Sequence, residues 1–328
     1  MKCFLFIVLW TLSVCAGATN RKKHVTVVFY NVENLFDIFD GPEIKDEEFL
    51  PGSSKKWTLE RYHKKLEDIA RVITDIDQED LPEIVGFCEI ENQTVLNDLV
   101  KSGKMATGNY QIVHIDSPDG RGMDVAFLYR KGEFKVLAYE TLQVDPGFST
   151  RDILHVYGKL GPDKVHFFVN HWPSRIGGLK KSQPGRIVAA KVLRQKVSQI
   201  LAQDPFAKIV IMGDLNDEPL NESVLNMLGA KAPGSGADLV NLMLPLDEEK
   251  LGSYYYRGEW NMLDNLIVTG PLLKGKGFTT KAPGHIFHEK WMEYKNKEGD
   301  IIPNRTYGGP AYYGGVSDHF PVYLELTR

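Results

Sequence analysis

Apolar residues follow two distinct patterns along this chain. From Leu59 to Ile76 they recur every three or four positions with charges between them, which predicts one long amphipathic helix. Short β-branched runs such as residues 25–30 and 208–213 predict buried strands instead. Further strands are expected near residues 83–87, 110–115, 124–130, 134–139, 152–159, 164–170, 253–257, 260–268 and 320–326.

Three further helices are expected between the strands. Asn92 or Thr94 can cap a helix that runs to about residue 101, and Pro184 suits the first turn of a helix that runs to about residue 203. A shorter helix is expected near residues 221–229. Strands outnumber helices and several follow one another between residues 110 and 170, which favours mostly antiparallel or mixed sheets. Two sheets packed face to face, with helices outside, would bury these strands on both sides.

The first eighteen residues differ in character from the rest. Lys2 precedes an apolar stretch at residues 4–14, and small residues come just before the polar Thr19. This is the three-part form of a secretory signal, and it is too short for a spanning helix. We therefore expect residues 1–18 to be a signal peptide and the protein to be exported, either to the periplasm or out of the cell. Lipid anchoring at Cys15 is a weaker alternative, because Val14 is a poor residue before a lipoprotein cysteine.

No repeat, linker or break in composition divides residues 25–328, so we expect a single domain over residues 19–328. A monomer is expected separately, although the sequence does not determine the oligomeric state. The chain has 328 residues, 43% of them hydrophobic, which is ample for a large core. Its formal net charge of −4 argues against strong nonspecific attraction to nucleic-acid phosphates, although a local basic cleft is compatible with it. Without residues 1–18 only Cys88 remains, so no intramolecular disulfide is expected.

Polar residues directly follow or precede several predicted strands. A carboxylate, an amide and an acid–imidazole pair are the groups that the attack of water on a phosphoester requires. One such residue often only ends a strand or caps a helix, but caps have no reason to select His, Asn and Asp together. The combination indicates a hydrolase. Its residues are Asn31, Glu89, Asn170, His171, Asp214, Asn216, Asp264, Asp318 and His319.

Six short motifs carry a resemblance to a known family. They are Tyr30-Asn31-Val32-Glu33-Asn34, Cys88-Glu89-Ile90-Glu91-Asn92, Asn170-His171-Trp172-Pro173-Ser174, Gly213-Asp214-Leu215-Asn216, Leu263-Asp264-Asn265 and Ser317-Asp318-His319-Phe320-Pro321. The chain resembles the endonuclease/exonuclease/phosphatase superfamily, also called deoxyribonuclease I-like, and looks most like its secreted bacterial branch. The resemblance implies a four-layer α/β/β/α sandwich with two mixed, mostly antiparallel sheets, and Mg²⁺-dependent hydrolysis of phosphoesters.

The resemblance also implies a metal site. Glu89 matches the metal-binding glutamate of the family, and Asn31 and Asp318 would line the same ion. Oxygen ligands suit Mg²⁺, with Mn²⁺ as an alternative, and no Cys or His cluster points to zinc. Glu91 competes with Glu89, because alternation along a strand puts both on one side. Glu89 is preferred because it occupies the family's Gln-Glu or Leu-Glu position.

Catalytic roles follow from the same resemblance. Asp214 and Asn216 would orient water and donate to a non-bridging oxygen of the phosphate. Asp264 would pair with His319 and favour its imidazolium form. His171 falls where some members of the family have a second histidine that donates a proton to the leaving group. Either Asp214 or His319 can be the general base, and the sequence leaves this choice open.

Arg175, Arg121 and Tyr313 are weaker candidates for contact with the substrate. Arg175 precedes a Gly-Gly loop and could clamp a phosphate, although exposed arginines in loops are more often only solvated. Arg121, before Asp124, is similar. Tyr313 lies in a glycine-rich run before Asp318 and offers a ring for stacking, and a plain turn explains that run equally well.

The sequence supports three functions in order of preference. The first is an exported Mg²⁺-dependent phosphodiesterase of nuclease type, whose partner is a phosphoester substrate such as a nucleic acid. The second is a phosphomonoesterase or phospholipase C-like enzyme acting on sugar, inositol or lipid phosphates, since a fold does not fix the substrate. The third is a noncatalytic surface binding protein, which would be expected to have lost at least one of the catalytic residues.

Overall fold

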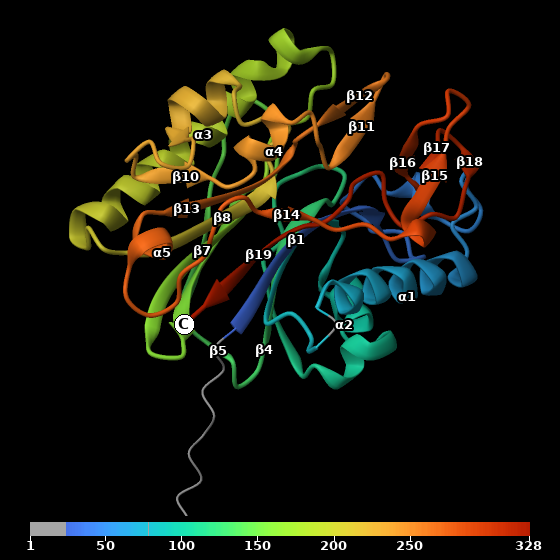
Figure 1. The fold of residues 1–328 in the computed structure, drawn as a ribbon. Helices are drawn as coiled ribbons and strands as arrows, with labels where there is room; N and C mark the ends of the chain where they lie inside the picture. The colour runs from blue at the N-terminus through green and yellow to red at the C-terminus, as the bar shows by residue number, and fades with distance from the viewer. Residues whose placement is uncertain (1–23, 78) are drawn as a thin grey trace, which may run out of the picture.

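Two large sheets pack face to face, with helices on their outer faces (Figure 1). The computed structural model describes residues 24–77 and 79–328. The expected signal peptide and Cys15 lie outside the described residues. The apolar core between the sheets includes Phe29, Phe167 and Met212, all fully buried. The family resemblance therefore gave the right fold class, a four-layer α/β/β/α sandwich.

The first sheet has the strand order β14-β19-β1-β2-β4-β3. Its β1–β2 pair is parallel, and its other neighbouring pairs are antiparallel. The bounds of its strands are β1 (His24–Leu35), β2 (Ile84–Ile90), β3 (Tyr110–His114), β4 (Asp124–Arg130), β14 (His285–Ile286) and β19 (Val322–Thr327).

The second sheet has the strand order β5-β6-β7-β8-β13-β10-β9. It is also mixed, because β7–β8 and β10–β9 are parallel while the remaining neighbours are antiparallel. The bounds of its strands are β5 (Phe134–Leu142), β6 (Ile153–Leu160), β7 (Asp163–His171), β8 (Lys208–Asp214), β13 (Asp264–Thr269), β10 (Leu239–Asn241) and β9 (Ala230–Lys231).

Helices α1 (Leu59–Ile76) and α2 (Gln93–Leu99) cover the outer face of the first sheet, and α3 (Leu179–Gln203) covers the second. Asn92 caps α2, accepting hydrogen bonds from the backbone N–H groups of Thr94 and Val95. The short helices are α4 (Leu244–Glu248), α5 (Pro271–Lys274) and turns at residues 47–49, 103–107, 223–228 and 290–292. The part of the chain that the structure describes also forms three small hairpins, β11–β12 (Tyr254–Tyr256, Glu259–Asn261), β15–β16 (Glu293–Lys295, Ile301–Pro303) and β17–β18 (Tyr307–Gly308, Ala311–Tyr312).

Helix α3 begins at Leu179, so the expectation that Pro184 lies in its first turn is wrong. Gly178 has a φ of 104°, a non-helical conformation that residues with a Cβ rarely adopt. The helix therefore starts directly after it. Pro184 then lies inside the helix, where it cannot donate a backbone hydrogen bond. The buried Arg186 braces this turn, because its guanidinium donates to the carbonyl of Leu179 at 3.1 Å and to Oγ of Ser182 at 2.9 Å.

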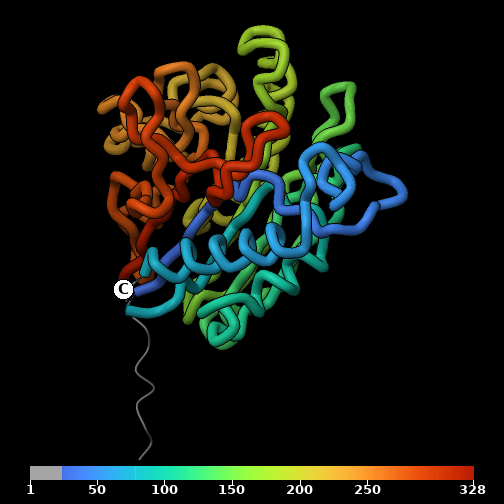
Figure 2. The backbone as a smooth tube through the Cα atoms, turned by 90° about the vertical axis from the view of Figure 1, so that its right-hand side faces the viewer, coloured from blue at the N-terminus to red at the C-terminus, as the bar shows by residue number. Residues whose placement is uncertain are grey.

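Strand alternation brings polar side chains to the rim between the two sheets. Val27 and Phe29 of β1 point into the inter-sheet core, and Asn31 follows at the next inward position. In the same way, Met212 of β8 is followed by Asp214. The strand ends that carry the predicted site residues therefore meet at one edge of the sandwich. Figure 2 shows the last loops of the chain, in red, beside the end of β1, in blue.

Candidate active site

Hydrogen bonds connect predicted site residues of both sheets. Nδ2 of Asn31 donates to Oε1 of Glu89 at 3.2 Å and to Oδ2 of Asp214 at 3.0 Å. Nε2 of His319 lies 3.9 Å from the same Asp214 oxygen, and its Nδ1 lies 2.6 Å from Oδ2 of Asp264. An unbroken series of contacts thus runs from Glu89 to Asp264, and these five residues form one site.

Asp214 and Asn216 are held by the turn that ends β8. The backbone N–H of Asn216 donates to Oδ1 of Asp214 at 2.8 Å, and its side-chain amide donates to the carbonyl of Trp172 at 3.0 Å. Gly213 is required here because a Cβ would come within 2.4 Å of the carbonyl oxygen of Asn170. The glycine allows β8 to approach β7 closely and sets the position of the Asp214 carboxylate.

Glu89 reaches the site through a bulge in β2. Its φ is 62°, and the pairing register with β4 shifts between Cys88 and Ile90. Its Oε2 accepts a hydrogen bond from the backbone N–H of Asn34 at 2.9 Å. Glu91 instead accepts one from Asp37 at 2.6 Å, and burial raises the pKa of Glu91 to about 8. The contact between Glu89 and Asn31 therefore places Glu89 in the site.

Several non-glycine residues with a positive φ lie around this rim. Glu33 and Asn34 follow Asn31 with φ values of 50° and 60°, and Asn216 has a φ of 50°. A non-glycine residue in this region is unfavourable and persists only where its surroundings fix it. The hydrogen bonds of Asn34 and Asn216 to the site carboxylates provide that fixation.

His171 ends β7 and faces Asp214. Its Nε2 lies 3.8 Å from Oδ2 of Asp214, while its Nδ1 has no hydrogen-bond partner among the described residues. Burial lowers the pKa of His171 well below its usual range, and the nearby Arg151 and Arg121 lower it further. Arg151 is itself buried and donates to the carbonyls of His171 and Trp172 at 3.2 and 2.7 Å. The His171 imidazole is therefore neutral at pH 7.

His319 is charged in the same surroundings. Burial alone would lower its pKa, but the carboxylates of Asp264 and then Asp214 raise it to about 10. Burial raises the pKa of Asp214, and the charge of His319 opposes that effect. The ring of Tyr254 packs against His319, with centroids 4.7 Å apart. The site thus combines a cationic and a neutral imidazole around one carboxylate.

Asp318 is placed at the rim by its neighbour Ser317. Oγ of Ser317 donates to the carbonyl of Asn31 at 2.7 Å and accepts from the backbone N–H of His319 at 3.1 Å. The Asp318 side chain is 23% exposed, and Arg305 approaches it at 3.4 Å. Within the described residues no direct hydrogen bond joins Asp318 to Asn31 or Glu89.

The donor atoms of the rim suit a hard divalent cation. Glu89 and Asp318 contribute carboxylates that are only partly buried, and Asn31 contributes an amide beside them. Oxygen donors of this kind are those that Mg²⁺ and Mn²⁺ bind. Two groups of deeper side chains also hold possible ligand atoms within 4.8 Å of one another: Asp214, Asp264 and His319, and Cys88, His171 and Asp214.

The three predicted substrate contacts lie around the same rim. Arg175 donates to the carbonyl of Asn216 at 2.7 Å and to Oδ1 of Asn261 at 2.8 Å, so it braces the loop that carries Asn216. Arg121 pairs with Asp119, and its side chain is 45% exposed. Tyr313 is 61% exposed beside the β17–β18 hairpin. Their roles toward a substrate stay predictions.

A family model supplies the sequence relationship that these motifs suggested. The model described as Endonuclease/Exonuclease/phosphatase family matches residues 26–328. The chain belongs to this family. No curated protein matches the sequence.

Solved structures of the family share the fold at low sequence identity. Humanized D. rerio TDP2 with 14 mutations aligns with a TM-score of 0.60 and 14% identity, covering 94% of this chain and 100% of that one. The Bacteroides thetaiotaomicron mannosyl-6-phosphatase Bt3783 aligns at 0.59 and 17%, covering 93% and 100%. The human Nocturnin catalytic domain with bound sulfate aligns at 0.55 and 13%, covering 93% and 95%. These matches establish the fold of the chain.

Three residues that the sequence did not indicate contact the site residues or their neighbours: Lys65, Arg151 and Tyr254. Lys65 offered a signal, because it lies on the apolar face of α1 at helical spacing from Tyr62 and Ile69. A lysine in that stripe must find buried acceptors. Arg151 and Tyr254 offered no such pattern, since their contacts depend on how loops fold together.

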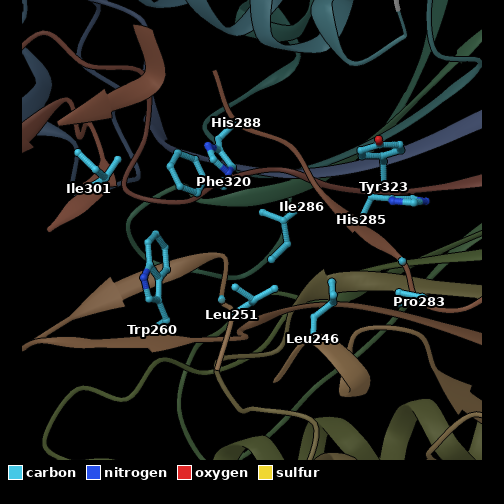
Figure 3. Close-up of a pocket in the computed structure, with 12 residues that line it drawn as sticks. Leu246, Leu251, Trp260, Pro283, His285, Ile286, His288, Ile301, Phe320 and Tyr323 are labelled. Atoms are coloured by element: carbon cyan, nitrogen blue, oxygen red, sulfur yellow. The ribbon is translucent and has the colours of Figure 1, made fainter. Parts of the chain in front are cut away.

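An apolar pocket of about 410 Å³ lies next to this site but outside it. Phe320, which directly follows His319, forms one wall, and Trp260 stacks on it with centroids 5.8 Å apart. Figure 3 shows Trp260 and His288 on either side of the Phe320 ring. None of the predicted catalytic residues lines this pocket.

None of the helices in residues 24–77 and 79–328 is long and apolar enough to cross a lipid bilayer.

Proposed function

We propose that this chain is an exported, Mg²⁺-dependent phosphoesterase of nuclease type, which hydrolyses a phosphodiester by in-line attack of water. The observation that carries the proposal is the series of contacts from Glu89 through Asn31, Asp214 and His319 to Asp264. It brings candidate metal ligands, a proton acceptor and a cationic donor to one rim. Membership of the family supports phosphoester chemistry.

The proposed division of labour follows from the charges. Asp214 accepts the proton of the attacking water, because His319, with a pKa of about 10, already carries a proton. The His319 imidazolium donates to a non-bridging oxygen of the phosphate, and Asp264 keeps it oriented. The neutral imidazole of His171 donates a hydrogen bond, rather than a proton, from its ring N–H to the leaving oxygen. Asn216 holds the Asp214 carboxylate in place through its backbone N–H.

Glu89, Asn31 and Asp318 would hold the divalent cation. When bound, Mg²⁺ or Mn²⁺ supplies positive charge that stabilises the phosphate and the leaving oxygen.

The proposal of export depends on residues 1–18, and N-terminal sequencing of protein recovered outside the cytoplasm tests it.

A phosphomonoesterase acting on sugar, inositol or lipid phosphates is the second candidate. It is kept because a structure of similar fold is a mannosyl-6-phosphatase, while another is TDP2 complexed with a single-strand DNA product. The fold alone therefore does not separate diester from monoester substrates.

A substrate panel with and without EDTA tests the proposal. Purified protein with Mg²⁺ or Mn²⁺ is assayed on single- and double-stranded DNA and RNA, bis-p-nitrophenyl phosphate, p-nitrophenyl phosphate, sugar phosphates and phospholipids. We expect cleavage of diesters that EDTA abolishes and excess Mg²⁺ restores. His319→Ala should lose this activity, whereas the exposed His63→Ala should keep it. Cleavage of monoesters alone would select the second candidate, and no cleavage of any substrate would leave a noncatalytic binding protein.

A further inference from the structure

Lys65 is a buried lysine of α1 whose ammonium group reaches the back of the site. The residue is 2% exposed. Its Nζ donates to the carbonyl of Glu33 at 2.7 Å, to Oγ1 of Thr306 at 2.6 Å and to the carbonyl of Val316 at 2.9 Å. An ammonium has three donors, so these three acceptors satisfy it fully. Such a buried charge is retained only where its partners are fixed.

The three acceptors belong to the segments that carry two of the three candidate metal ligands, Asn31 and Asp318. Glu33 lies two residues after Asn31, and Val316 lies two residues before Asp318. The backbone N–H of Glu33 donates to Oδ1 of Asn31 at 3.0 Å, which links the lysine to that side chain through one residue. In Figure 2 the red segment before β19 lies beside the end of β1, with α1 alongside both.

Further hydrogen bonds connect the end of β1 to the segment of residues 306–316. The Glu33 carboxylate accepts from the backbone N–H groups of Thr306 and Tyr307 at 2.7 and 3.2 Å. Oγ1 of Thr306 in turn lies 3.2 Å from the carbonyl of Val316. The Lys65 ammonium is also attracted to the carboxylates of Glu33, Asp318 and Glu89. Removing the Lys65 ammonium would remove the hydrogen bonds that connect the end of β1 to residues 306–316. It would also remove the positive charge that attracts these carboxyl groups.

We propose that Lys65 is a positioning residue that holds the segment carrying Asp318 against the end of β1 and thereby sets the metal affinity of the site. The inference rests on the proposed function, because it takes Asn31, Glu89 and Asp318 as the ligands. Residues behind metal ligands commonly change affinity by roughly 10- to 100-fold when they are altered.

The chain contains a matched control. Lys208 is also buried, and its Nζ donates to three oxygens, Oδ2 of Asp163 at 2.6 Å and the carbonyls of Lys276 and Phe278 at 2.7 and 2.9 Å. It begins β8, whereas Asp214 ends that strand, about 20 Å away at 3.3 Å per residue. Replacing either lysine removes three hydrogen bonds of an ammonium group, but of the two only Lys65 contacts the site segments.

Mn²⁺ binding to the full chain, measured by isothermal titration calorimetry, tests the proposal. We expect Lys65→Met to raise the dissociation constant for Mn²⁺ at least tenfold and Lys208→Met to change it less than twofold. Melting temperatures should fall in both variants. Thr306→Val, which removes one acceptor, should raise the constant about threefold, and this variant decides the matter if Lys65→Met does not fold.

Wild-type affinity in Lys65→Met, or in Thr306→Val where only that variant folds, would overturn the proposal, as would equal losses in the Lys65 and Lys208 variants. Each of these results leaves the proposed function intact, because the wild-type chain still binds Mn²⁺ and cleaves phosphoesters. A wild-type chain that binds no Mn²⁺ and cleaves no substrate would instead overturn the proposed function together with this inference.

Discussion

Among single residues, Asp214 is where the contacts of the site converge. Its Oδ2 accepts from Asn31 and lies 3.8 and 3.9 Å from nitrogens of His171 and His319, while its Oδ1 accepts from Asn216. Two imidazoles, an amide and a backbone N–H thus surround one buried carboxylate. A charge in this position can accept a proton from water that enters between the imidazoles.

Asp214→Asn should lower kcat at least about a hundredfold, because the amide keeps the shape of the side chain but cannot act as a general base. The measurement is turnover of bis-p-nitrophenyl phosphate with Mg²⁺, together with circular dichroism to show that the fold is intact. The exposed Asp238→Asn serves as the control. Turnover at the wild-type level in Asp214→Asn would remove this residue from the role of base.

At the scale of elements, the cap of α2 fixes the chain just after the Glu89 bulge. Oδ1 of Asn92 accepts from the backbone N–H groups of Thr94 and Val95 at 2.7 and 3.0 Å. Asn92→Ala should lower the free energy of unfolding by about 1 kcal/mol, the usual cost of losing such a cap. Urea denaturation measures it. Asn97→Ala, an exposed position of the same helix, is the control, and an equal loss there would contradict the capping argument.

A second element, the pair β6–β7, carries two stacked histidines. Nε2 of His155 lies 2.9 Å from Nδ1 of His166, and burial followed by the charge of His155 lowers the pKa of His166 to about 4. Because the unfolded chain binds this proton near pH 6.5, the folded state is fully favoured above that pH and loses stability as pH falls toward 4.

His166→Phe should therefore flatten the loss of stability between pH 7 and pH 5, since phenylalanine keeps the stacking on Tyr157 and does not titrate. Melting temperatures at the two pH values measure the effect for the variant and the wild type. His63→Gln changes an exposed histidine and should leave the slope unchanged. An unchanged dependence of the melting temperature on pH in His166→Phe would contradict the attribution of this loss of stability to His166.

The whole molecule depends on the core between the sheets, which also holds the two halves of the site together. Phe167 is fully buried there and packs against Phe127 and Phe134 with centroids 5.3 and 5.5 Å apart. Phe167→Ala should lower the free energy of unfolding by about 3–5 kcal/mol through lost burial and a cavity. Phe206, which is 80% exposed, gives a control that should change by less than about 0.5 kcal/mol. Similar losses in both variants, measured by urea denaturation, would contradict this reading of the core.

The sequence by itself determined the long helix α1, the main strands and the set of polar residues at the strand ends. These features are local, because hydrophobic period and strand ends are written in neighbouring residues. The resemblance to the family then gave the four-layer arrangement. The catalytic and metal-binding roles of the polar residues at the strand ends stay predictions, as does export, and the experiments above test them.

Only the tertiary structure decided which side chains meet. Strict alternation left Glu89 and Glu91 equivalent, and the bulge at Glu89 separated them. The tertiary structure also showed that α3 starts at Leu179 and that Lys65 joins β1 to the segment before Asp318. Each of these outcomes depends on backbone strain or on hydrogen bonds between segments far apart in the chain, and a local pattern of residues carries no record of either.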